Sequence, residues 1–158
     1  MLTPQIESAL NKMILLENSV SRLYTLYAER FPSHGGLWTI LANEETEHAD
    51  WITKLTEQAR AGKMEIAANR FKAEAVQMML NSLGTYMAEA GSGNPPLLKC
   101  LSISMTLETA LIEKDFFRIF QTDSSELRTV MNRLTAATEN HQRMVKQAWQ
   151  KAREDAGI

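Results

Sequence analysis

The sequence predicts an all-α fold: a four-helix bundle with a helical crossover segment between its second and third long helices. No stretch shows the alternation of apolar and polar residues that a β-strand requires. Glycine and proline cluster at only three places, residues 31–36, Gly84 and residues 91–96, and so leave long helical stretches between them. We expect residues 1–158 to form one domain, because this length suits a single core.

Capping signals and glycine or proline stops set the ends of the expected helices. The five expected segments are residues 4–30, 36–61, 70–90, 95–121 and 123–153. The first begins after Thr3 as N-cap with Pro4 in the first turn, the fourth begins after Asn94 as N-cap, and the fifth opens with the capping-box spacing Asp123-Ser124-Ser125-Glu126. Gly62 stops the second segment, and Gly84 breaks the third. The segment 70–90 is the expected crossover, and the other four form the bundle.

Composition excludes several classes of function. The formal net charge is −2, which gives no general electrostatic reason to bind nucleic acid or an anionic membrane. No apolar run approaches the roughly 18 residues of a transmembrane helix, and no secretory signal is visible. Cys100 is the single cysteine, which rules out an internal disulfide and a four-cysteine metal site within one chain. We therefore expect a cytoplasmic protein.

The expected helix 36–61 carries a polar pair in the middle of an apolar seam. Its seam positions, spaced alternately three and four residues apart, are Trp38, Leu41, Glu45, His48, Ile52 and Leu55. A carboxylate buried on such a seam costs several kcal/mol unless it is paired or binds a metal. Glu45 and His48 project from one face, one turn apart, and could offer an oxygen and a nitrogen to the same ion.

Two other helices repeat this arrangement. In segment 4–30, Glu17 is the one charged position on a seam that also contains Tyr24. In segment 123–153, His141 takes the place that His48 has in segment 36–61, and Thr138 takes the place of Glu45. We expect these side chains to converge in the core.

Two carboxylates compete on segment 95–121. Glu113 is favoured because both Glu17 and Glu113 are followed by an arginine five residues later and an aromatic residue seven residues later. Glu108 lies about 140° away around the helix and cannot share that face. The predicted metal ligands are therefore Glu17, Glu45, His48, Glu113 and His141.

These motifs resemble the ferritin-like superfamily of carboxylate-bridged di-iron proteins, in particular rubrerythrin-type bundles. The family pattern is one Glu from each of two helices and Glu-x-x-His from each of the other two. This chain matches five of the six ligand positions, with Thr138 in place of a bridging carboxylate. Because it lacks the four cysteines of a rubredoxin module, redox activity would need an external electron donor. The resemblance also implies a homodimer or larger assembly.

The ligand set suits one or two iron ions, with manganese or zinc as alternatives. Tyr24 is a candidate to hydrogen-bond a ligand carboxylate, and Glu139 could reach the site only if its helix were distorted. Three functions remain open: an oxidoreductase acting on peroxide, oxygen or ferrous iron; a non-catalytic metal carrier or sensor; and a structural module that has lost its metal. The sequence identifies no catalytic residue.

Overall fold

The computed structural model describes residues 2–71, 73–113 and 116–158, apart from the side chains of residues 68, 111–113, 116 and 117. Within these ranges it contains five α-helices: α1 (Pro4–Arg30), α2 (Gly35–Arg60), α3 (Ala73–Ser92), α4 (Leu97–Glu113) and α5 (Ser125–Asp155). Three short 3-10 helices are η1 (Pro32–His34), η2 (Ala68–Arg70) and η3 (Phe116–Ile119), and two short strands are β1 (Glu65–Ile66) and β2 (Phe120–Gln121). The prediction of an all-α chain is confirmed.

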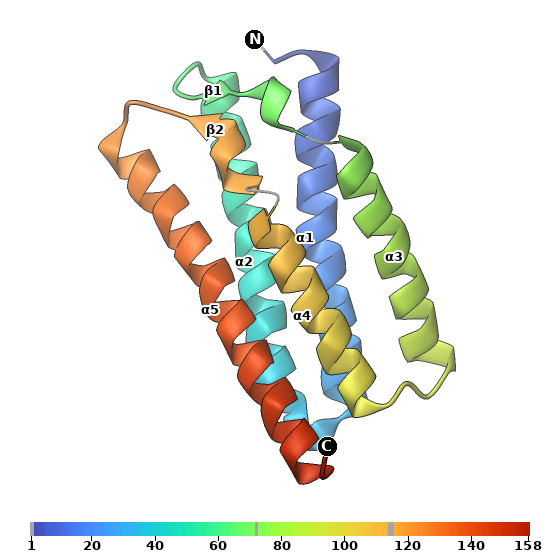
Figure 1. The fold of residues 1–158 in the computed structure, drawn as a ribbon. Coiled ribbons are helices and arrows are strands. Elements are labelled where there is room, and N and C mark those ends of the chain that lie inside the picture. Colours follow the sequence, from blue (N-terminus) through green and yellow to red (C-terminus); the bar gives the residue numbers. More distant parts are fainter. Residues whose placement is uncertain (1, 72, 114–115) are drawn as a thin grey trace.

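The chain reverses direction at each long helix (Figure 1). Helices α1 and α2 form one antiparallel pair and α4 and α5 another, and each pair is in extensive contact. Helix α3 lies against α1 and returns the chain from the β1 end to the end where α4 begins. Helix α2 also contacts α5, which brings the two pairs together.

Local signals explain most helix ends. The Thr3 hydroxyl accepts a hydrogen bond from the Ile6 amide at 3.2 Å, and α1 ends at Arg30 as expected. Helix α5 begins at Ser125, two residues later than expected, because Ser124, rather than Asp123, accepts from the Leu127 amide. Asn94 does not act as the predicted N-cap of a helix that begins at residue 95: its side chain accepts from Arg30, and α4 begins at Leu97.

Three other expectations are wrong. Gly84 does not break α3, because one glycine costs a helix only about 1 kcal/mol. Helix α4 ends at Glu113, well before Gln121. Strands are present after all: Ile66 pairs with the buried Phe120, and Glu65 pairs with Gln121. This ladder of two residues per strand is too short to show an alternating pattern.

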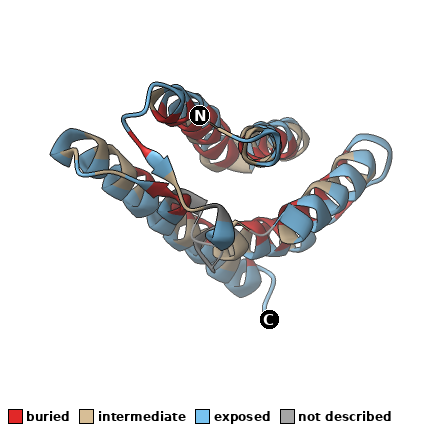
Figure 2. Ribbon diagram, turned by 90° about the horizontal axis from the view of Figure 1, so that it is seen from above, coloured by how far each residue is buried: buried red, intermediate tan, exposed pale blue. Residues whose placement is uncertain are grey.

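The core lies along the faces that the helices turn toward one another (Figure 2). It includes large aromatic side chains near one end, where Trp38 packs on Tyr27 with ring centroids 5.2 Å apart. Polar side chains are buried in the same core, among them two histidines and three glutamates. In the part of the chain that the structure describes, no helix is long and apolar enough to cross a membrane.

Candidate metal centre

Four helices each place an ionisable side chain in one region of the core. Glu17 comes from α1, Glu45 and His48 come from α2, and Glu108 and His141 come from α4 and α5. All five are buried, with at most 4% of any residue exposed. They are buried because each occupies a position on an apolar helix face: the seam that runs through Glu45 and His48, for example, is buried from Trp38 to Leu55.

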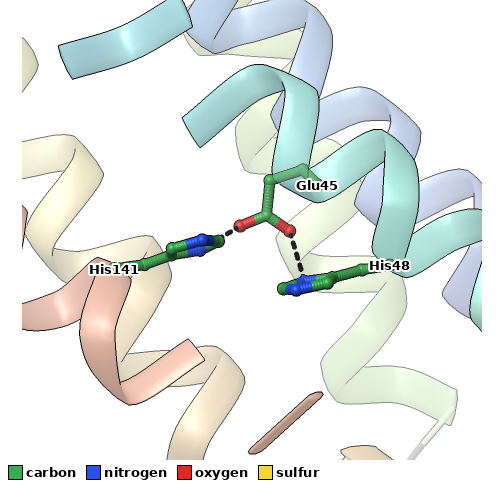
Figure 3. Close-up of side chains that lie close together, drawn as sticks. All are labelled: Glu45, His48 and His141. Carbon is green, nitrogen blue, oxygen red and sulfur yellow. Dashed lines mark hydrogen bonds and ion pairs between the residues drawn. The ribbon is translucent and has the colours of Figure 1, made fainter. Parts of the chain in front are cut away.

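Glu45 is at the centre of this cluster, between two imidazole rings (Figure 3). One carboxylate oxygen lies 3.0 Å from Nδ1 of His141, and the other lies 3.3 Å from Nδ1 of His48. The two rings are stacked, with centroids 5.3 Å apart and an angle of 19° between their planes. Both Nδ1 atoms therefore face the same carboxylate.

The other two carboxylates flank this group. Glu17 Oε2 lies 4.0 Å from His48 Nδ1, and Glu108 Oε2 lies 3.6 Å from His141 Nδ1. The other oxygen of Glu108 accepts a hydrogen bond from the buried Tyr24 hydroxyl at 2.7 Å. Each imidazole thus has Glu45 on one side and a second carboxylate nearby.

Three oxygens of this cluster make no hydrogen bond, although a histidine Nδ1 atom lies 3.3–4.0 Å from each. They are Glu17 Oε2, Glu45 Oε2 and Glu108 Oε2, all buried, and each belongs to a different glutamate. A buried acceptor without a partner costs about 1–3 kcal/mol, and more when it is charged. A cation bound among these oxygens would offset that cost, so the chemistry of the residues fits a metal ion.

The pKa values of the buried glutamates in the metal-free cluster also favour a bound cation. Burial, followed by repulsion from Glu45, raises the pKa of Glu17 well above its ordinary value. Burial and the charge of Glu45 raise the pKa of Glu108 to about 7, despite the nearby His141 and the hydrogen bond from Tyr24. Two of the three carboxylates therefore hold protons more tightly than in water. A bound metal ion would displace those protons.

Glu45 and His141 form the charged pair at the centre. Burial acts to raise the pKa of Glu45, but its interactions with Glu17, His141 and His48 outweigh it and lower the pKa. Burial acts to lower the pKa of His141, but its interactions with the Glu108 and Glu45 carboxylates outweigh it and raise the pKa to about 11. Without a metal, the proton on His141 takes the place of a cation beside Glu45.

Glu45, His48 and His141 can each offer one ligand atom, all within 4.8 Å of one another. Two imidazole nitrogens with carboxylate oxygens suit iron, manganese or zinc. Glu17 and Glu108 lie next to this trio, so five side chains are available. Four of the five ligands predicted from the sequence, Glu17, Glu45, His48 and His141, lie together in the structure, and the side chain of the fifth, Glu113, lies outside the described residues.

The remaining predicted residues lie around this group. Thr138 is buried on the seam of α5, but its hydroxyl donates to the Leu134 carbonyl of its own helix at 3.0 Å. Tyr24 bonds a cluster carboxylate, as the sequence suggested, and that carboxylate is Glu108. Glu139 is exposed on a continuous helix and does not reach the site.

Sequence reasoning missed two residues of this region. Glu108 was set aside in favour of Glu113, although Leu101, Ser104 and Glu108 keep the same three-and-four spacing as the other seams and are all buried. Its distance to Thr138 is 30 residues, close to the 28 between Glu17 and Glu45. The seam spacing and the distance to Thr138 together could have identified Glu108 as a site residue.

Glu44 is the second residue missed, because it lies in a run of charges that looks solvated. Its side chain is 39% exposed, yet it bonds Nε2 of the fully buried His141. A carboxylate on the outer nitrogen fixes the ring so that the inner nitrogen faces the cluster, an arrangement that raises the basicity of histidine ligands of metals. No local sequence signal indicates this contact, since it depends on how α2 and α5 pack.

Comparisons with known proteins found no relative. No family model matches the chain, and neither a curated protein nor a solved structure matches it. The ferritin-like resemblance therefore depends on the residues named above, and the structure supports its coarser content: a helical protein with a buried Glu/His cluster that could hold a metal ion.

Proposed function

We propose that this chain is a ferritin-like metal-binding protein whose cluster holds one or two ions of iron or manganese, and that it acts as an oxidoreductase. The observation that carries the proposal is the convergence of three carboxylate oxygens that make no hydrogen bond on two stacked imidazoles in a buried region. Such a group is costly in an empty core and is the usual donor set for these ions.

Glu17, Glu45, His48, Glu108 and His141 would hold the metal. A bound iron or manganese ion would supply redox chemistry toward peroxide, oxygen or ferrous iron. The chain's own residues would prepare the site: Glu44 orients His141, and Tyr24 fixes one oxygen of Glu108 so that the other faces the cluster. Electrons would come from an external donor, because Cys100 is the only cysteine.

Thr138 favours a second candidate, a non-catalytic protein that binds one ion. Its hydroxyl is engaged with its own helix, so α5 offers only His141 to the cluster, whereas α2 offers Glu45 and His48. This asymmetry supports tighter binding on the side of Glu17, Glu45 and His48. About one ion per chain with no redox reaction would favour this candidate.

Metal analysis combined with rapid mixing tests the proposal. The purified chain is loaded with ferrous ion without oxygen, its metal content is measured, and its oxidation by peroxide is followed by stopped-flow absorbance. Glu45→Gln is the test variant, and Glu57→Gln, an exposed change on the same helix, is the matched control. We expect bound iron that oxidises faster than free ferrous ion in the wild type and the control, and loss of iron in Glu45→Gln. A wild-type chain that retains no metal would leave only a structural bundle.

A further inference from the structure

A small pocket opens on the outside of the bundle between α2 and α5 and reaches the metal centre. It has a volume of about 170 Å³, and His48 is among the residues that line it. The His48 side chain keeps 6% of its surface exposed, whereas the side chains of Glu45, Glu108 and His141 keep none. His48 is therefore the most exposed member of the cluster, since the Glu17 side chain keeps only 2%.

The α5 side of this pocket includes one small residue, Ala137, among larger ones. Ala137 lines it together with Leu134, one turn away. On the α2 side the wall includes Trp51, which is 37% exposed and is covered by the Lys54 ammonium group at 4.6 Å from the ring centroid. A larger side chain at position 137 would project into this space and cover His48.

The chemistry of the lining restricts what can enter. Glu47 and Arg133, both exposed, line the pocket with opposite charges, so their fields favour neither a cation nor an anion. The rest of the lining is largely apolar and includes Trp51, Val130, Leu134 and Ala137. The volume is also below the roughly 300 Å³ at which pockets for drug-sized ligands begin, although it exceeds what one water molecule needs.

We propose that this pocket is the route by which a small uncharged molecule of a few atoms reaches the metal ion on its His48 side, with Ala137 keeping the route open. The inference rests on the proposed function, since without a bound ion there is nothing for the ligand to reach. It adds the class of ligand and its point of entry, which the residues of the cluster alone do not specify.

Nitric oxide binding to the ferrous-loaded chain tests this route without any turnover, because nitric oxide is a neutral two-atom ligand of ferrous iron. The test variant is Ala137→Phe, which fills the pocket. The control is Ala136→Phe, which places the same side chain on the exposed face of the same helix. Iron content is measured first for each protein, and the rate of nitric oxide binding is then measured by stopped-flow absorbance.

We expect Ala137→Phe to keep its iron and to bind nitric oxide about tenfold more slowly or worse, because entry then requires an opening motion. Ala136→Phe should match the wild type. Equal rates in an iron-loaded Ala137→Phe protein would overturn the route and leave the proposed function intact, whereas a wild-type chain without iron would overturn both.

Two further measurements cover the remaining outcomes. If Ala137→Phe loses its iron, Trp51→Ala, which widens the mouth, should bind nitric oxide faster than the wild type, and an unchanged rate would overturn the proposal. Azide tests the charge of the occupant: if Ala137→Phe slows azide but not nitric oxide, the pocket admits anions and the proposal of an uncharged ligand is wrong.

Discussion

Replacing Glu108 with Gln should change the stability of the metal-free protein and its metal affinity in opposite directions. Glu108 is fully buried, faces His141 and Glu45, and has one oxygen without a partner. Gln keeps the shape and can still accept the Tyr24 hydrogen bond, but it carries no charge. The substitution therefore removes the cost of a buried charge and also removes a metal ligand.

The magnitude follows from the pKa of Glu108, which is raised by burial from 4.5 to about 7. Between these values the native state holds a proton that the unfolded state has lost, so the free energy of unfolding falls as pH rises. The difference corresponds to about 3 kcal/mol across this interval. For a chain of this size, that amount is worth about 6–12 °C in Tm.

His141 adds to the same trend at higher pH. Its pKa is raised to about 11, so its contribution to stability is complete below pH 6.5 and is lost as pH rises toward 11. Glu45 acts in the opposite sense, because its lowered pKa contributes stability that is lost as pH falls below 4.5. The metal-free protein should therefore be most stable near pH 5, which is more acidic than is usual for a folded domain.

Thermal unfolding of chelator-treated protein from pH 4.5 to 8 measures these effects. The wild type should lose stability from pH 5 to 7, and Glu108→Gln should lose clearly less, so that the variant is the more stable protein at pH 7 and equal to the wild type near pH 4.5. Added metal should stabilise the wild type more than the variant. A Glu108→Gln protein that is no more stable than the wild type at pH 7 would refute the reasoning.

Three further substitutions test individual contacts. Thr138→Glu should raise the affinity for a second ion about tenfold or more by supplying a missing oxygen ligand, and it should destabilise the metal-free chain; unchanged stoichiometry in a metal titration would contradict this. Glu44→Gln should lower metal affinity by about 10- to 100-fold by weakening the support of His141, as measured by competition with a chelator, while the exposed change Glu139→Gln leaves it unaltered. Tyr24→Phe should cost about 1–3 kcal/mol in chemical unfolding, because it leaves a second Glu108 oxygen without a partner; a loss within error would show that this bond is not needed.

The sequence predicts the fold class and the seams of three site helices. Glu17, Glu45, His48 and His141 follow from one physical argument: an ionisable residue at a seam position must be buried, and buried charges need partners. That argument works because the apolar spacing continues on both sides of each residue. It predicts that α1, α2 and α5 face a common interior without knowledge of how they pack.

For helix α4, the site residue was chosen by a different argument from that used for the other three helices. The choice of Glu113 relied on matching Arg and aromatic positions after two glutamates, and such matches do not report which face of a helix is buried. The spacing of Leu101, Ser104 and Glu108 does report it, and all three are buried. The β1–β2 ladder and the contact between Glu44 and His141 join segments far apart in the chain, so no local pattern indicates them.

Anomalous diffraction from crystals of the metal-loaded protein would test the central claim most directly. With data collected at the absorption edge of the bound metal, we expect a peak about 2.0–2.3 Å from ligand atoms of Glu45, His48 and His141. A metal-loaded crystal with no peak in the cluster, in which Glu45 still lies directly between the two imidazoles, would contradict the account.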